Sequence, residues 1–253
     1  FNVQRGLAAR GWPDMLDWIF MSTNIRHILE RSKQSLLLAA TGAALSLTLS
    51  ASAAVDVQLD VSEVPELQAW GDKAKNLCEE WSPKILDLLP SEGFKGADTV
   101  YLKFSKDMKG VAATGGDHIT VSASYVKHAT NDFGMVIHEL VHVVQAYPPH
   151  KKGFQSPGWL VEGIADYIRL FKFEPDAPRP AIDPAKASYR DAYKTTAIFL
   201  DWASRKYDKD LVAKLNRPLR AGEFKIQLFT EITGKDVDAL WKEFTDSLPQ
   251  KQE

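Results

Sequence analysis

The residues best suited to catalysis or metal binding are two histidines and a glutamate in the segment MVIHELVHVVQAY, residues 135–147. His138 and His142 are four positions apart, so on a helix both imidazoles lie on one face and can bind one metal ion. Glu139 follows His138 directly and can reach a water molecule beside that ion as a general base. The H-E-x-x-H pattern is typical of zinc sites, in which imidazole nitrogens bind Zn²⁺ at about 2.0–2.1 Å. The segment therefore predicts a zinc site on a helix.

A second segment, GWLVEGIADYIRL, supplies two carboxylates at helical spacing, Glu162 and Asp166. Two acids in apolar surroundings repel each other and lose hydration unless a cation lies beside them. We predict that Glu162 completes a His, His, Glu ligand set. Asp166 can accept the outer N–H of His138 or His142 and so fix its tautomer. The alternatives are histidines of a core helix that bond to backbone carbonyls, and a solvated acidic face that pairs with Arg169.

The remaining histidines fit a metal site less well. A metzincin site requires glycine and histidine where this chain has Gln145 and Pro148. His150 follows two prolines and precedes two lysines, which is typical of a surface loop. His118 and His128 are expected at a strand edge and in a loop. Three protein ligands with an open fourth position are typical of catalytic zinc, whereas structural zinc usually has four protein ligands.

Composition excludes several other classes of protein. The chain has 253 residues, of which 45% are hydrophobic and 25% charged, and its formal net charge is −2. It is therefore too apolar for a disordered chain and not basic enough to favour nucleic-acid binding. The single cysteine, Cys78, cannot form an intrachain disulfide or a four-cysteine zinc site. Cys78 lies in a predicted amphipathic helix with no histidine nearby in sequence, so we expect it to be buried rather than nucleophilic.

The N-terminal region has the pattern of a secretory signal. Met21 precedes a basic stretch and then the uncharged run SLLLAATGAALSLTLSASAAV, which ends in an A-x-A arrangement of small residues. We expect a signal peptide over 21–54, cleaved after Ala53 or Ala54, and a secreted or periplasmic protein that is monomeric and has no membrane anchor after cleavage. The alternative is an uncleaved anchor. Residues 1–20 are expected to be an upstream extension outside the fold.

The elements that must position these residues change in character along the chain. Alternating apolar residues predict strands in the first half, and helical spacing predicts helices mainly in the second half. The predicted strands are 55–61, 99–104 and 118–126. The predicted helices are 65–89, 131–146, 158–173, 189–206, 208–217, 223–232 and 236–247. A loop with three glycines separates the second and third strands, and four prolines between 175 and 184 predict an irregular surface loop.

Five sequence blocks resemble those of the basic secretory protein family of peptidases. They are HELVHVVQ, PGWLVEGIADYIRL, DAYKTTAIFLDW, LVAKLNRPL and GKDVDALWKEF. The resemblance covers about residues 55–247 and implies an α+β, zincin-like fold. In that fold a lobe with a small mixed β-sheet and the active-site helix precedes a mostly α-helical lobe. We expect one domain over 55–250, with sub-lobes of about 55–147 and 148–250.

The resemblance also implies roles for individual residues in a gluzincin-type zinc metalloendopeptidase. The implied zinc ligands are His138, His142 and Glu162, and the implied general base is Glu139. It adds Tyr193 as a phenol that hydrogen-bonds the oxyanion, with Tyr189 as the substitute candidate. The chain departs from the family name because its expected mature form is acidic.

We therefore expect a secreted zinc metalloendopeptidase that acts on peptide or protein substrates. The extended substrate is expected to pair as an added strand along residues 118–123. Two alternatives stay open. One is a secreted, non-catalytic binding or structural protein that zinc stabilises, and the other is a metal-dependent amidase that acts on cell-wall peptides.

Overall fold

The computed structural model describes residues 55–148 and 153–249, which belong to one compact unit, Ala51–Glu253. The extension expected over 1–20, the signal peptide expected over 21–54, and His150 lie outside the described residues. Among the residues that the structure describes, no helix combines the length and apolar character needed to cross a membrane.

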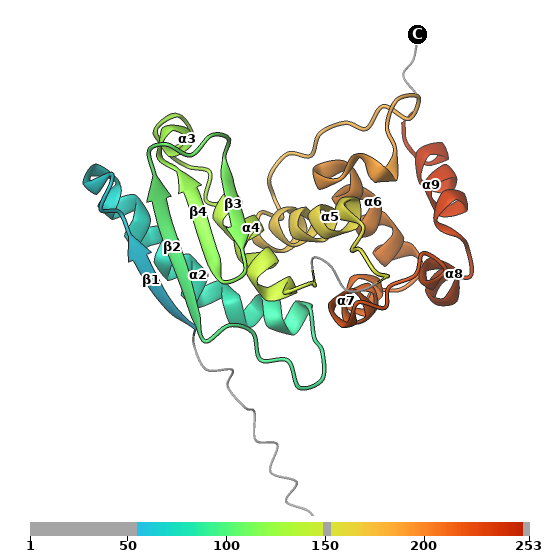
Figure 1. The fold of residues 1–253 in the computed structure, drawn as a ribbon. Coiled ribbons are helices and arrows are strands. Elements are labelled where there is room, and N and C mark those ends of the chain that lie inside the picture. Colours follow the sequence, from blue (N-terminus) through green and yellow to red (C-terminus); the bar gives the residue numbers. More distant parts are fainter. Residues whose placement is uncertain (1–54, 149–152, 250–253) are drawn as a thin grey trace, which may run out of the picture. The chain divides into compact units, whose positions relative to one another are not determined.

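A four-stranded mixed sheet forms the N-terminal side of the unit (Figure 1). Its strands are β1 (Asp56–Asp60), β2 (Thr99–Ser105), β3 (Ala112–Gly115) and β4 (His118–Ser122). The spatial order is β1-β2-β4-β3, in which β1, β2 and β4 are parallel and β3 is antiparallel to β4. In β2, Val100 and Leu102 are buried whereas Tyr101 and Lys103 are exposed. One face of the sheet therefore packs on the core, as the period of two predicted.

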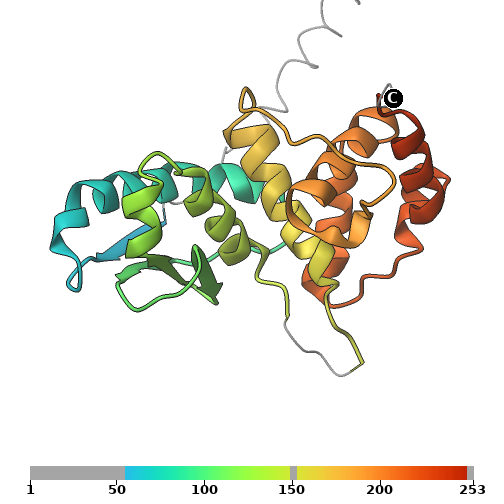
Figure 2. The ribbon, with the colours of Figure 1, turned by 90° about the horizontal axis from the view of Figure 1, so that it is seen from above.

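Two helices pack on the buried face of this sheet. They are α2 (Gln68–Leu88), which follows a 3₁₀ turn at Pro65–Leu67, and α4 (Gly134–Gln145). Figure 2 shows both helices on the same side of the sheet. Cys78 of α2 is fully buried, which confirms the expectation from the sequence. Burial raises the pKa of the Cys78 thiol to about 12, so at neutral pH it is not a nucleophile.

The segment between residues 105 and 128 differs from the sequence prediction in two ways. The predicted strand over 118–126 ends at Ser122, whose hydroxyl accepts a hydrogen bond from the Tyr125 backbone N–H and caps helix α3 (Ala123–His128). The predicted glycine loop contains strand β3, which pairs with β4 as a hairpin. The short sequence AATG carries no alternating pattern, so only its pairing with β4 identifies β3 as a strand.

The C-terminal side is helical, as predicted. Its elements are α5 (Gly158–Ile168), a π-helical turn (Arg169–Phe173), η3 (Tyr189–Asp191), α6 (Tyr193–Lys206), α7 (Leu211–Ala221), α8 (Leu228–Thr233) and α9 (Val237–Asp246). The proline-rich segment between Phe173 and Tyr189 contains no regular helix. Together with the mixed sheet, these helices confirm the expected α+β fold class.

The helix predicted over 189–206 is interrupted. Ala192 has φ 64° and ψ −169°, and Tyr193 has φ 46°, both in the region that non-glycine residues rarely adopt. A capping box formed by Ser188 and Asp191 closes the preceding 3₁₀ turn. The break separates Tyr189 from Tyr193, so the two tyrosines do not share the face that an unbroken helix would give them.

Candidate active site

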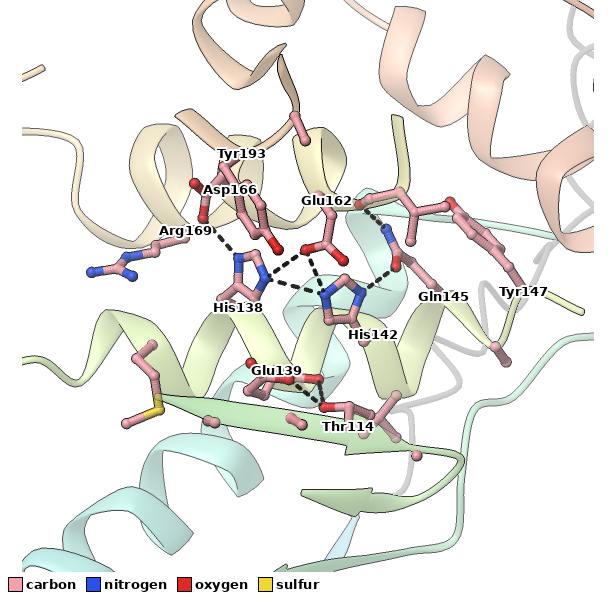
Figure 3. A pocket seen from close by; sticks show the side chains of 18 of the residues that line it. Thr114, His138, Glu139, His142, Gln145, Tyr147, Glu162, Asp166, Arg169 and Tyr193 are labelled. Carbon is pink, nitrogen blue, oxygen red and sulfur yellow. Dashed lines mark hydrogen bonds and ion pairs between the residues drawn. The ribbon is translucent and has the colours of Figure 1, made fainter. Parts of the chain in front are cut away.

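Helix α4 carries its candidate site residues, His138, Glu139 and His142, on two different faces. The helix is buried along most of its length, and the Asp132 carboxylate accepts a hydrogen bond from the Met135 backbone N–H in its first turn at 3.2 Å. In Figure 3, His138 and His142 point toward α5, and Glu139 points toward β3. The helix thus separates the two candidate metal ligands, His138 and His142, from the candidate base by about a quarter turn.

Three side-chain atoms from α4 and α5 converge on one point (Figure 3). The Nε2 atoms of His138 and His142 are 3.1 Å apart. Oε2 of Glu162 lies 3.1 Å from Nε2 of His138 and 3.3 Å from Nε2 of His142. For ligand bonds of about 2.0–2.1 Å, a tetrahedron has edges of about 3.3–3.4 Å. The spacing and the N, N, O donor set therefore fit an ion such as Zn²⁺, and the group could hold a metal.

The charges of this cluster depend on one another in the metal-free chain. Burial would lower the pKa of His138, but hydrogen bonds to Asp166 and Glu162 outweigh it and raise that pKa to about 9. Burial would raise the pKa of Glu162, but its close contacts with His138 and His142 outweigh that effect and lower the pKa to about 2. A bound cation would take the place of the proton shared within the cluster.

Asp166 is buried, with 3% of its surface exposed, and contacts only one of the two candidate histidines. Its Oδ1 lies 2.7 Å from Nδ1 of His138. The corresponding Nδ1 of His142 instead faces Oε1 of Gln145 at 2.8 Å. The structure thus places Asp166 behind His138, where the sequence left both histidines open.

Glu139 is held by the neighbouring strand. Its Oε2 and its backbone carbonyl oxygen lie 2.7 Å and 3.0 Å from the Thr114 hydroxyl of β3. The Glu139 side chain is buried but borders the same cleft as the histidines. Thr114 therefore anchors one carboxylate oxygen and leaves Oε1 for another partner.

Tyr193 lies over the cluster of His138, His142 and Glu162, the candidate metal ligands. Its ring stacks on His138 with 6.0 Å between the centroids, and 54% of its surface is exposed. The charge of Glu162, followed by partial burial, raises the pKa of Tyr193, so the phenol stays protonated and can donate a hydrogen bond. Tyr189 is 3% exposed and packs edge-on against Trp159 and Trp241. This burial in the aromatic core separates Tyr189 from the cluster and leaves Tyr193 as the candidate phenol.

The candidate ligands, Asp166, Glu139 and Tyr193 line one cleft of about 1480 Å³. Its walls come from β3, α4, α5, the start of α6 and the loop around Phe94. The predicted site residues that line it are His138, Glu139, His142, Glu162, Asp166 and Tyr193. The cleft therefore brings these six predicted site residues together from three separate elements, α4, α5 and the start of α6.

Two residues at the site were missed by the sequence reasoning, Thr114 and Gln145. Gln145 lies three positions after His142 in the block HELVHVVQ, so helical spacing could have indicated its contact with that histidine. Thr114 has no such signal, because it reaches Glu139 only through the packing of β3 on α4.

A family model described as BSP, peptidase of plants and bacteria, matches residues 67–244 of the chain. The matched region contains β2, β3, β4 and helices α2 to α9 in whole or in large part, and thus the whole cleft. Comparison with curated proteins and with solved structures gave no match.

Proposed function

The chain belongs to the BSP family of peptidases of plants and bacteria, and from this premise we propose that it is a zinc-dependent metalloendopeptidase. Membership of a peptidase family implies that its substrates are proteins or peptides. The observation that carries the zinc proposal is the convergence of His138, His142 and Glu162 within about 3 Å of one another in an open cleft. Three ligands leave a fourth position for a reacting group, as in catalytic zinc sites.

His138, His142 and Glu162 would hold the ion, which when bound supplies a Lewis acid that activates water and polarises the scissile carbonyl. Glu139 accepts the proton of the attacking water and delivers it to the leaving amine. Thr114 restrains Glu139 in this task through the 2.7 Å contact with its carboxylate. Asp166 holds the ring of His138 through Nδ1.

Tyr193 supplies a hydrogen bond to the oxyanion that develops on the carbonyl oxygen. Two observations support this role: its ring lies against His138, and its phenol is kept protonated beside Glu162. The two residues with positive φ, Ala192 and Tyr193, bring this side chain to the cleft instead of along the face of Tyr189.

The substrate is proposed to lie along β3. The pairing expected along residues 118–123 is wrong, because β4 is an interior strand that already bonds to both β2 and β3. Residue 123 also belongs to helix α3. β3 is the last strand of the sheet and borders the cleft next to α4. An extended peptide can therefore add to its outer edge by main-chain hydrogen bonds.

The test compares the purified wild-type chain with Glu139→Gln for zinc content and for cleavage of an unstructured protein such as casein. We expect about one zinc per chain in both, and cleavage only by the wild type. Cleavage by Glu139→Gln would reject Glu139 as the base. A zinc-loaded wild type that cleaves neither proteins nor cell-wall peptides and unfolds on chelation would instead indicate zinc as a structural element.

We also propose that the chain is exported and monomeric. The basic stretch after Met21 and the uncharged run that follows support export. N-terminal sequencing of the protein recovered from periplasm and medium is expected to begin at residue 54 or 55. Light scattering is expected to give the mass of one chain.

A further inference from the structure

Gln145 closes α4 three residues after His142, and only 1% of its surface is exposed. Its Oε1 lies 2.8 Å from Nδ1 of His142, and its Nε2 donates to the Val161 carbonyl oxygen at 3.0 Å. We propose that Gln145 is a positioning residue that selects the metal-binding tautomer of His142 and ties that histidine to the helix that carries Glu162. This inference rests on the zinc site proposed above.

The orientation of the Gln145 amide follows from its second partner. The Val161 carbonyl oxygen can only accept hydrogen bonds, so the NH₂ group of Gln145 must face it. The reversed amide would place two oxygen atoms against each other at 3.0 Å. Oε1 of Gln145 therefore faces His142, and because Oε1 can only accept, Nδ1 of His142 carries the hydrogen.

This hydrogen decides what the other ring nitrogen can do. A neutral imidazole has one N–H, so with Nδ1 protonated the Nε2 of His142 keeps its lone pair. That atom is the one directed at Nε2 of His138 and at Glu162. Metal ligation requires a free lone pair at this position. The backbone carbonyl of Val161 thus fixes, through Gln145, the state of a ligand on the adjacent helix.

In their neutral forms the two histidines would take the same tautomer, each through a different acceptor. His138 donates to the carboxylate of Asp166, whereas His142 donates to the neutral amide of Gln145. Glu162 and Asp166, which contact the histidines, already balance the charge of a divalent ion. A neutral acceptor at Gln145 therefore orients His142 without adding to the negative charges of Glu139, Glu162 and Asp166 in the same cleft.

The same amide joins the two helices that carry the ligands. Val161 directly precedes Glu162 in α5, so the bond from Gln145 ends one residue away from the third ligand. The backbone of Gln145 is fixed from α7, because Nε of Arg220 donates to its carbonyl oxygen at 3.1 Å. Arg220 also donates to the Val144 carbonyl oxygen at 2.9 Å, a favourable place for a cation at a helix C-terminus.

The experiment compares the wild type with Gln145→Met, which has a similar length but no hydrogen-bonding group. Gln68→Met is the matched control, because Gln68 is exposed and its side-chain amide donates to Asp72 one helical turn away in α2, far from the candidate site. The first readout is the Kd for Zn²⁺, measured by competition with a chromophoric chelator. The second is the NMR signal of the Nδ1–H proton of His142 in the metal-free protein, assigned by its absence in His142→Ala.

We expect Gln145→Met to raise the Kd for Zn²⁺ by about 10- to 100-fold and to lose the Nδ1–H signal. Gln68→Met is expected to keep both wild-type values. Gln145→Glu retains an acceptor for Nδ1 and is expected to recover the Nδ1–H signal, although its second oxygen would face the Val161 carbonyl oxygen. If Gln145→Met does not fold, Gln145→Asn replaces it, because the shorter amide cannot span His142 and Val161 together.

An unchanged Kd in Gln145→Met, or a retained Nδ1–H signal, would overturn the proposal. Absence of the Nδ1–H signal in Gln145→Glu would also reject the acceptor role. If the wild type itself binds no zinc, the proposed function fails. The NMR signal of the metal-free chain then still decides whether Gln145 sets the tautomer of His142.

Discussion

Thr114 and Glu139 come from different elements and meet through a single hydroxyl group. The Thr114 Oγ1 lies 2.7 Å from the Glu139 carboxylate and 3.0 Å from the Glu139 carbonyl oxygen. One hydroxyl hydrogen can serve one strong bond at a time, and the shorter contact is the one to the carboxylate. Thr114 thus fixes the candidate base relative to the edge strand on which the substrate is proposed to lie.

Thr114→Val is expected to lower kcat by about tenfold, because it removes the hydrogen bond that holds the Glu139 carboxylate in place. A hydrogen bond to a charged group contributes about 1.5–3 kcal/mol, and we expect part of this energy to be lost from the transition state. Zinc content should stay unchanged, since Thr114 contacts no metal-binding residue. Steady-state kinetics with a quenched peptide and metal analysis of the same samples measure both quantities. Thr114→Ser, which keeps the hydroxyl, is the control, and equal kcat in all three proteins would contradict the positioning of Glu139 by Thr114.

Tyr193→Phe is expected to reduce kcat by about 10²–10³-fold with little change in KM, because the lost hydrogen bond forms only as the oxyanion develops. Its exposure of 54% predicts that the free energy of unfolding changes little. The comparison is Tyr189→Phe, which removes a phenol oxygen outside the cluster and should leave kcat near the wild-type value. A larger loss of kcat in Tyr189→Phe than in Tyr193→Phe would reverse the assignment.

Gly163→Ala is expected to destabilise the fold by about 1–3 kcal/mol through overpacking. A Cβ at Gly163 would lie 2.2 Å from Cγ2 and 2.6 Å from Cβ of Thr196, so α5 and α6 would have to separate. Urea unfolding measures the change. Gly158→Ala in the same helix is the matched control, because a Cβ there meets no atom within 4 Å. Similar unfolding midpoints for both variants would show that the close approach of α6 to Gly163 does not contribute to the stability of the fold.

Cys78 is expected to resist thiol reagents at neutral pH until the chain unfolds. Burial raises its pKa to about 12, and the thiolate is the reactive form. Because ionisation is favoured in the unfolded chain, the free energy of unfolding should fall as pH rises above the unfolded pKa of about 8.5. Absorbance after addition of a disulfide reagent, with and without denaturant, measures the reactivity. Rapid labelling of the native chain would show that α2 does not bury Cys78.

Most of the ligand geometry within each helix could be predicted from sequence. His138 and His142, and likewise Glu162 and Asp166, share a helical face because residues four apart always do so in a helix. Strands β1 and β2 were also predictable, because apolar and polar residues alternate along each of them. Such features depend on neighbours within one or two turns, so a local pattern carries them.

Contacts between elements could not be predicted in the same way. The choice of His138 over His142 as the partner of Asp166 depends on how α5 crosses α4. The break at Ala192, which separates Tyr193 from Tyr189, depends on a strained backbone that no propensity favours.

The amino-acid sequence by itself therefore determined the kinds of chemical groups and their order along each helix, because helical periodicity is a local property. Only the tertiary structure decided that β3 forms the edge of the sheet and that Thr114 restrains Glu139. Those relationships depend on backbone pairing and packing between segments that are distant in sequence. The four residues of β3 contain too little local signal to specify them.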